Sequence, residues 1–191
     1  MNILKNAIQS KNVPNIILYG CDKNSQKEKL YDLLKESYNH SEKILINEKD
    51  IKYYKTDIYY IFNMSNIVTK NIDFFFTIID KIIKTSNHFS NLKYKIIIFE
   101  NFELIKQSIQ NILRVKIEKY RITTIFFLIT SNIGSIIQPL KSRCLCIRFP
   151  LLTKKEKRDL IKTKINYKEL DSNFYDKLYE IDDTNVILSL D

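Results

Sequence analysis

The chain has 191 residues, 45% of them hydrophobic and 28% charged, which is enough for one α/β domain and a short appendage. The formal net charge of +9 favours polyanionic partners, nucleic acid first, although a Lys-rich solvated surface accounts for the same excess. No apolar stretch is long enough for a membrane span and no signal peptide is evident, so we expect a soluble intracellular protein.

Apolar runs alternate with helical patterns along the chain. After a short helix in residues 1–10 we expect a strand at 15–19, a helix at 25–37, a strand at 57–62, a helix at 71–85, a strand at 94–99, a helix at 103–120, and strands at 125–130 and 144–149. Residues 38–54 are interpreted as a loop-bearing region. This alternation predicts crossover connections and a parallel sheet with helices on both faces.

The pattern changes after Pro150, where two polar helices with thin apolar stripes are expected. We therefore divide the chain into an α/β domain, residues 1–150, and a partial helical lid, residues 151–191. The three cysteines are odd in number and lack a framework spacing, so we expect buried free thiols in a reducing compartment.

Two blocks of residues resemble the clamp-loader branch of the AAA+ ATPases, the replication factor C type. The first block follows the strand at 94–99 and matches a helix of the form QNALRR-x-MEKY; the second matches I-x-P-L-x-SRC followed by Phe. The matching residues are Gln110, Asn111, Leu113, Arg114, Glu118, Lys119 and Tyr120, and then Ile137, Pro139, Leu140, Ser142, Arg143, Cys144 and Phe149. The resemblance implies an AAA+ type α/β fold; the family's N-terminal base-contacting segment and its collar domain have no counterpart in this sequence.

The family's phosphate loop, G-x-x-x-x-G-K-[ST], is degenerate here. Gly20 matches its first glycine, whereas Gln26 stands in place of the lysine and Lys27 in place of the hydroxyl. Phe99 stands where the family has its magnesium-ligating Asp, Glu100 keeps the position of the residue that polarises water, and Ser131 or Asn132 falls at the sensor position. We expect no metal, no required cofactor and no ATP hydrolysis, although weak ATP binding without turnover stays open.

Arg143 is the candidate for chemistry, because the resemblance implies an arginine finger that reaches the ATP site of a neighbouring subunit. The alternative for Arg143 is an ion pair with a local carboxylate. Family members also follow DNA with helix N-termini and basic side chains, which suggests Thr69, Lys70 and Lys106 as phosphate contacts, with plain solvation as the alternative.

These residues lead to the hypothesis of a non-hydrolysing clamp-loader-like subunit. Its expected partners are other clamp-loader subunits, a sliding clamp and primer-template DNA, without a membrane, in the nucleus or at another site of DNA replication. Two alternatives remain at this point: a basic DNA-binding or scaffolding module without loader activity, and an atypical ATP-binding subunit.

Overall fold

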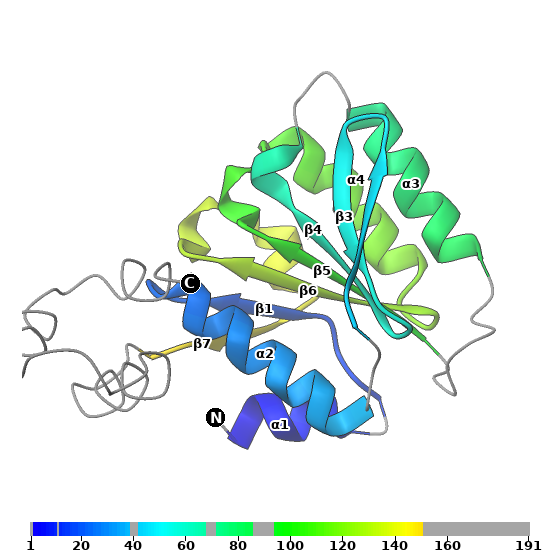
Figure 1. Cartoon of the computed structure of the whole chain (residues 1–191). Helices are drawn as coiled ribbons and strands as arrows, with labels where there is room; N and C mark the ends of the chain where they lie inside the picture. Colours follow the sequence, from blue (N-terminus) through cyan, green and yellow to red (C-terminus); the bar gives the residue numbers. More distant parts are fainter. Residues whose placement is uncertain (1, 11, 39–41, 68–71, 86–93, 151–191) are drawn as a thin grey trace, which may run out of the picture.

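Runs of Ile, Leu and Phe that are buried on both faces form the centre of a seven-stranded sheet in the order β2-β3-β4-β5-β6-β1-β7 (Figure 1), whereas the edge strands β2 and β7 are largely exposed. The structure is a computed structural model that describes residues 2–10, 12–38, 42–67, 72–85 and 94–150. The strands are β1 (Ile16–Tyr19), β2 (Ile44–Glu48), β3 (Ile51–Lys55), β4 (Tyr59–Asn63), β5 (Lys95–Glu100), β6 (Thr124–Thr130) and β7 (Leu145–Arg148). All neighbours from β4 to β7 pair in parallel, as the strand–helix alternation predicts.

Helices cover both faces of the sheet, so the central parallel strands are buried from both sides. Helices α1 (Asn2–Ile8) and α2 (Lys23–Tyr38) pack on one face through Leu4, Leu30 and Leu34. Helices α3 (Ile72–Lys84) and α4 (Gln107–Lys119) cover the other face, where Phe75 and Leu113 join the larger core cluster. A short helix, α5 (Gln138–Lys141), and the 3₁₀ turns η1 (Met64–Asn66), η3 (Phe102–Leu104) and η4 (Ile133–Ser135) lie between strands and helices.

Part of the predicted loop region is instead a β-hairpin, so the sheet is mixed rather than wholly parallel. Strand β2 pairs antiparallel with β3, and β3 pairs antiparallel with β4. The turn consists of Lys49 and Asp50, whose φ angles of 46° and 69° are those of a two-residue hairpin turn usually made by Asn-Gly. Because neither residue is Gly, the sequence carries no strong hairpin signal at this turn.

The predicted helix at 103–120 was also wrong at its start. Phe102–Leu104 forms a separate 3₁₀ turn after Asn101, which has φ 54°, and α4 begins only at Gln107 because Lys106 is extended. The other predicted strands and helices of residues 1–150 lie within two residues of their expected bounds, whereas the short helix α5 was not predicted. The predicted lid, residues 151–191, falls outside the described residues.

The cysteines are less buried than expected. Cys21 and Cys146 are exposed, and only Cys144 is partly covered. Burial, with a smaller contribution from Cys146, raises the pKa of the Cys144 thiol to about 12. Among the described helices, none combines the length and the apolar character needed to cross a membrane.

Candidate functional site

The loop that resembles a phosphate loop joins β1 to α2, and its side chains turn back onto the loop itself. Gln26 is fully buried, and its Nε2 donates to the Gly20 carbonyl oxygen at 2.9 Å. The Gln26 Oε1 is buried with no hydrogen-bond partner among the described residues. A Cβ on Gly20 would lie only 2.5 Å from the Phe149 carbonyl oxygen, so the end of β7 closes the other side of the loop.

Asp22 caps the N-terminus of α2, a role that the sequence interpretation missed. Its carboxylate accepts from the Ser25 backbone N–H at 3.0 Å and from the Ser25 hydroxyl at 2.6 Å. Asp22 is 3% exposed, so this carboxylate is already inside the protein. The N-terminus of a helix is where an anion is stabilised by unpaired N–H groups, and here the chain supplies that anion itself. The signal was present in the sequence as an Asp, a favoured N-cap residue, directly before the first helical residue Lys23.

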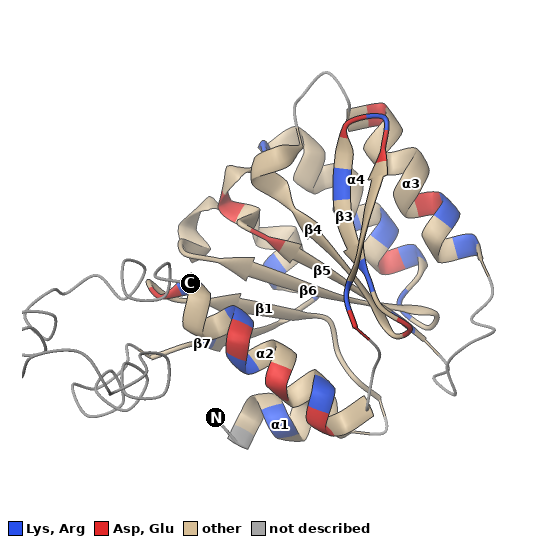
Figure 2. Ribbon diagram, in the orientation of Figure 1, with Lys and Arg blue, Asp and Glu red and all other residues tan. Residues whose placement is uncertain are grey.

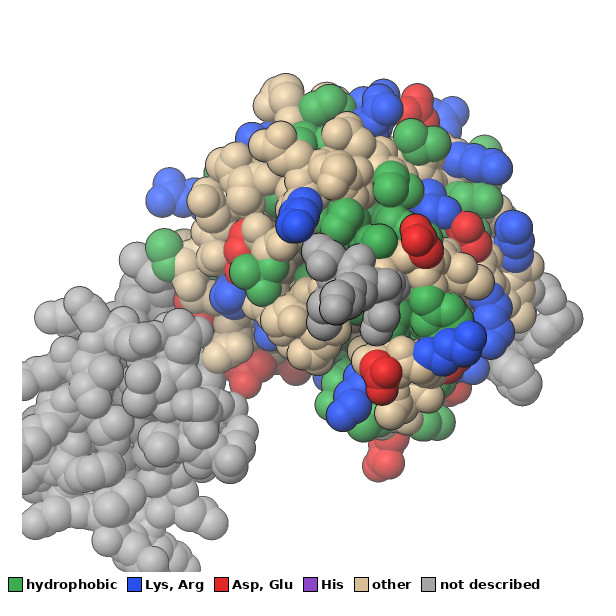
Figure 3. All heavy atoms as spheres, turned by 90° about the horizontal axis from the view of Figure 1, so that it is seen from above, with side chains coloured by type: hydrophobic (Ala, Val, Ile, Leu, Met, Phe, Trp, Pro, Cys, Tyr) green, Lys and Arg blue, Asp and Glu red, His purple; other side chains and the backbone are tan. Residues whose placement is uncertain are grey.

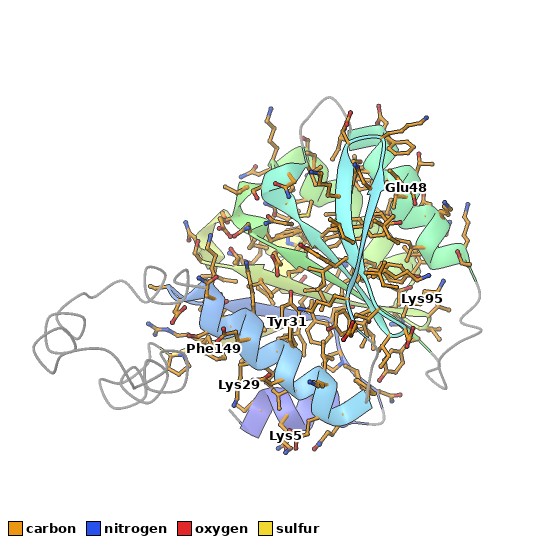
Figure 4. All side chains as sticks on the ribbon, in the orientation of Figure 1. Lys5, Lys29, Tyr31, Glu48, Lys95 and Phe149 are labelled. Carbon is orange, nitrogen blue, oxygen red and sulfur yellow. The ribbon has the colours of Figure 1, made fainter. Side chains whose placement is uncertain are left out.

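Glu100 and Lys27 pair with each other instead of facing the loop. The Lys27 Nζ lies 3.1 Å from the Glu100 Oε2, and the Tyr31 hydroxyl donates to Oε1 at 2.5 Å. Tyr31 extends from α2 toward the sheet and stacks on Tyr59 (Figure 4). Burial and then the Glu100 charge raise the pKa of Tyr31 well above its usual value, so the phenol stays a donor.

The other predicted loop-side positions are occupied by apolar or structural groups. Phe99 is fully buried and has ring contacts with Phe62, Phe102 and Phe126, so it offers no oxygen to a cation. The Ser131 N–H donates to the Glu103 Oε2 at 3.2 Å. Asn132 accepts from the Gly134 N–H and so starts the turn η4.

Lys23 connects α2 to the end of β5, a link that the resemblance did not indicate. Its Nζ donates to Glu103 at 2.8 Å and to Asn101 at 2.9 Å. Burial alone would raise the pKa of Glu103, but the hydrogen bonds from Lys23 and from the Ser131 N–H outweigh burial and lower it. Asn101 in turn donates to Asn63, so the carboxyl ends of β4 and β5 are tied together.

Arg143 lies just after α5, and its guanidinium remains partly exposed. The Arg143 Nε donates to Glu118 at 3.1 Å, and the two side chains are 32% and 58% exposed. Its Nη1 donates to the Pro139 carbonyl oxygen at 3.0 Å. The local ion pair considered from the sequence is therefore present, at the surface, where such pairs contribute about 0–1 kcal/mol.

Gln110 joins the segment that carries Arg143 to the start of α4. Its Oε1 accepts from the Ile137 N–H at 3.0 Å, and its Nε2 donates to the carbonyl oxygens of Ile105 and Ser135. The side chain is fully buried, so all three bonds are shielded from water. Gln110, the first residue of the first matching block, therefore contacts the segment that leads to Ser142, Arg143 and Cys144.

Of the predicted DNA contacts, only Lys106 can be placed. Lys106 is exposed immediately before α4, while Thr69 and Lys70 lie outside the described residues. Basic and acidic positions are interspersed on α2 and α3 (Figure 2). Seen from above, Lys and Arg side chains are spread over the surface with hydrophobic side chains exposed between them (Figure 3).

Comparison with curated proteins finds relatives of one kind. No protein-family model matches the chain. The chain is 26% identical over 166 residues to "Replication factor C subunit 2" of Phaeosphaeria nodorum, covering 80% of this chain and 40% of that protein. It is 24% identical over 162 residues to human "Replication factor C subunit 3", covering 77% and 45%. Over a shorter stretch of 60 residues, 31% of this chain and 18% of the relative, it is 43% identical to the rice "Replication factor C subunit 2". The chain therefore spans less than half the length of these relatives.

Solved structures show the same fold. A Thermotoga maritima protein described as related to the DNA polymerase III gamma subunit aligns with a TM-score of 0.60 at 19% identity, over 98% of this chain and 55% of that one. The RuvB protein of the same organism aligns with a TM-score of 0.52 at 13% identity, over 85% and 47%. Like these, the chain combines a mostly parallel sheet with helices on both faces.

Proposed function

We propose that the chain belongs to the clamp-loader branch of the AAA+ proteins, like the replication factor C subunits to which it is similar, and that it is a clamp-loader subunit that does not hydrolyse ATP itself. In this proposal it sits beside an ATPase subunit and supplies Arg143 to that neighbour's nucleotide. The assembly would place a sliding clamp on primer-template DNA at the site of DNA replication, in the nucleus where the cell has one.

The observation that supports the proposal most directly is a combination of two features: the loop between β1 and α2 is filled by its own side chains, and the Arg143 guanidinium is partly exposed. The Asp22 carboxylate occupies the α2 N-terminus, where a phosphate would otherwise be held. Arg143, in contrast, is held by the exposed Glu118 carboxylate, by the Pro139 carbonyl oxygen and, at 3.4 Å, by the Ser142 hydroxyl. An incoming phosphate offers the planar guanidinium a charge-assisted hydrogen bond that can replace the one to Glu118.

The test is the ATPase rate of the intact loader assembly that contains this chain. We expect Arg143→Ala to lower the neighbour's turnover by about 10³–10⁵-fold, the range known for arginine fingers. Arg143→Lys should restore little of it, because an ammonium lacks the planar donor fork.

Glu118→Ala is the matched control, since it breaks the same ion pair and leaves the guanidinium in place. A finger requires that Glu118→Ala keep the ATPase rate. If both alanine variants lower the rate equally, Arg143 has only a local structural role. If neither changes it, the proposal of a finger is wrong, and a DNA-binding or scaffolding role becomes the better explanation.

A further inference from the structure

A separate cleft opens beside α2, on the face of the hairpin that no described helix covers. Its volume is about 610 Å³, and it reaches from the hairpin to the carboxyl ends of β4 and β5. Its lining comprises Tyr31, Lys43, Leu45, Lys52, Tyr54, Ile61, Asn63, Asn66 and Glu100. Apart from Tyr31, Asn63 and Glu100, these residues take no part in the site described above.

The strand register arranges the floor of the cleft as two neighbouring rows. Leu45, Tyr54 and Ile61 are directly opposite one another on β2, β3 and β4 and form an apolar row. One step further along, the same register brings Lys52 beside Asn63, which is paired with Glu100. Alternation along the strands keeps each row on one face of the sheet. The apolar row therefore lies next to a row of polar side chains.

Two of the three residues of the apolar row are open to solvent, whereas the third, Ile61, is buried. Leu45 is 55% and Tyr54 45% exposed, whereas the opposite face of β3 buries Ile51 and Tyr53 in the core. The exposed ring of Tyr54 has no stacking partner among the described aromatic contacts. A flat ring with a free face is suited to another flat apolar group.

The charge of the cleft favours an anion. Lys43 and Lys52 are both exposed, and the Lys43 Nζ lies 3.9 Å from the centre of the Tyr31 ring. Partial burial of the Lys43 ammonium lowers its pKa, while the nearby Glu100 charge acts in the opposite direction, and a further anion would stabilise this ammonium. The one acidic group in the lining, Glu100, already has Lys27 and Tyr31 as partners, so it repels an anion less.

We propose that this cleft binds single-stranded nucleic acid, with a base stacked on Tyr54 and backbone phosphates at Lys43 and Lys52. Stacking platforms flanked by lysines are the usual means of holding unpaired strands. The side-chain amide of Asn66 offers a donor and an acceptor that match a base edge, whereas the Asn63 Oδ1 already accepts from Ser65 and Asn101. In a duplex the base faces are stacked on neighbouring base pairs, so the bases cannot stack on the Tyr54 ring. The site differs from the phosphate contact expected at Lys106, and it does not depend on the loader role.

The test measures the affinity of the full chain for a fluorescent oligothymidine by anisotropy, without any partner subunit. We expect Lys43→Gln with Lys52→Gln to weaken binding by about tenfold or more and to lower the salt slope by about 1.4, or about 0.7 for each lost phosphate contact. Tyr54→Ser should weaken binding about tenfold, while Tyr54→Phe, which keeps the ring, should bind like the unaltered chain.

The matched control removes the same net charge elsewhere, through Lys84→Gln with Lys119→Gln at the ends of α3 and α4. Thermal unfolding confirms that all variants are folded. The proposal fails if both double variants lose affinity equally, if Tyr54→Phe behaves like Tyr54→Ser, if duplex DNA or a free mononucleotide competes as well as the single strand, or if the unaltered chain does not bind at low salt. None of these outcomes depends on Arg143, so a failure here does not change the interpretation of the ATPase measurement on Arg143→Ala.

Discussion

Asp22 shows how one residue can change the use of a helix N-terminus. A phosphate loop works because several backbone N–H groups converge on an external anion. Here the carboxylate takes the Ser25 N–H and hydroxyl, and it is almost fully buried while doing so. A nucleotide phosphate would have to displace this carboxylate and would then meet its negative charge at close range.

We therefore predict that the isolated chain does not bind magnesium-ATP with a dissociation constant below about 1 mM, equivalent to about −4 kcal/mol. Isothermal titration calorimetry should give no saturable heat, with or without magnesium. Gln26→Lys alone should not restore binding, because Asp22 still occupies the helix end and the Phe149 carbonyl still lies against Gly20. Saturable binding at micromolar ATP would contradict this and would favour the atypical ATP-binding alternative.

At the scale of elements, Gln110 is the link between α4 and the segment that carries Arg143. Its amide serves three backbone groups, those of Ile105, Ser135 and Ile137, from a fully buried position. Removing the amide leaves these groups with no replacement partner on the side chain, and an unsatisfied buried group costs about 1–3 kcal/mol. The turn η4 and helix α5 depend on this support for their position relative to α4.

Gln110→Ala should accordingly lower the free energy of unfolding by about 1–3 kcal/mol. Amide hydrogen exchange should speed up in residues 135–143 more than in the central strands, because the loss falls on that segment. Asn111→Ala, one residue along α4 and exposed, is the control and should change neither quantity appreciably. Equal exchange in the two variants would show that α5 is positioned without Gln110.

The same scale shows what the sequence could and could not predict. Buried strands such as β5 and β6 are continuous apolar runs, so their place and type were evident. The hairpin was missed because Lys49 and Asp50 adopt positive φ without Gly. The start of α4 was missed because helical periodicity continues through Phe102–Leu104, although Asn101 and Lys106 interrupt the backbone. The cleft could not be foreseen, because it depends on which strands the hairpin pairs with.

For the whole molecule, the tyrosines set the response to alkaline pH. Among the tyrosines of the described residues, five have a raised pKa, chiefly through burial: Tyr31, Tyr38, Tyr53, Tyr59 and Tyr60. Burial raises the pKa of Tyr59 to about 12, while an unfolded tyrosine ionises near pH 10. Lys43 and Lys95 act in the opposite direction, because burial lowers the pKa of each. Lys95 is the first residue of β5, and its Nζ reaches the C-terminal end of α3, where it donates to the Ile83 carbonyl oxygen (Figure 4).

These shifts predict that the protein loses stability as the pH rises above about 10.5. In that range unfolded tyrosines release protons that the folded ones retain, so the unfolded state binds fewer protons and the free energy of unfolding falls. The opposing effect of Lys43 and Lys95 on the free energy of unfolding levels off near that pH, because unfolded lysines then also lose their protons. Urea unfolding at several pH values from about 9 to about 11.5 measures the slope.

Tyr59→Phe is the control for this prediction, because it removes one buried phenol and keeps the ring. The fall in unfolding free energy above about pH 10 should become shallower by up to about 1.4 kcal/mol per pH unit, the share of one proton. Part of the phenolate absorbance should appear only together with the loss of circular dichroism, whereas solvent-exposed tyrosines ionise in the folded chain as well. If the Tyr59→Phe variant shows the same slope as the unaltered chain, or if stability is unchanged through about pH 11, the buried tyrosines do not control alkaline unfolding.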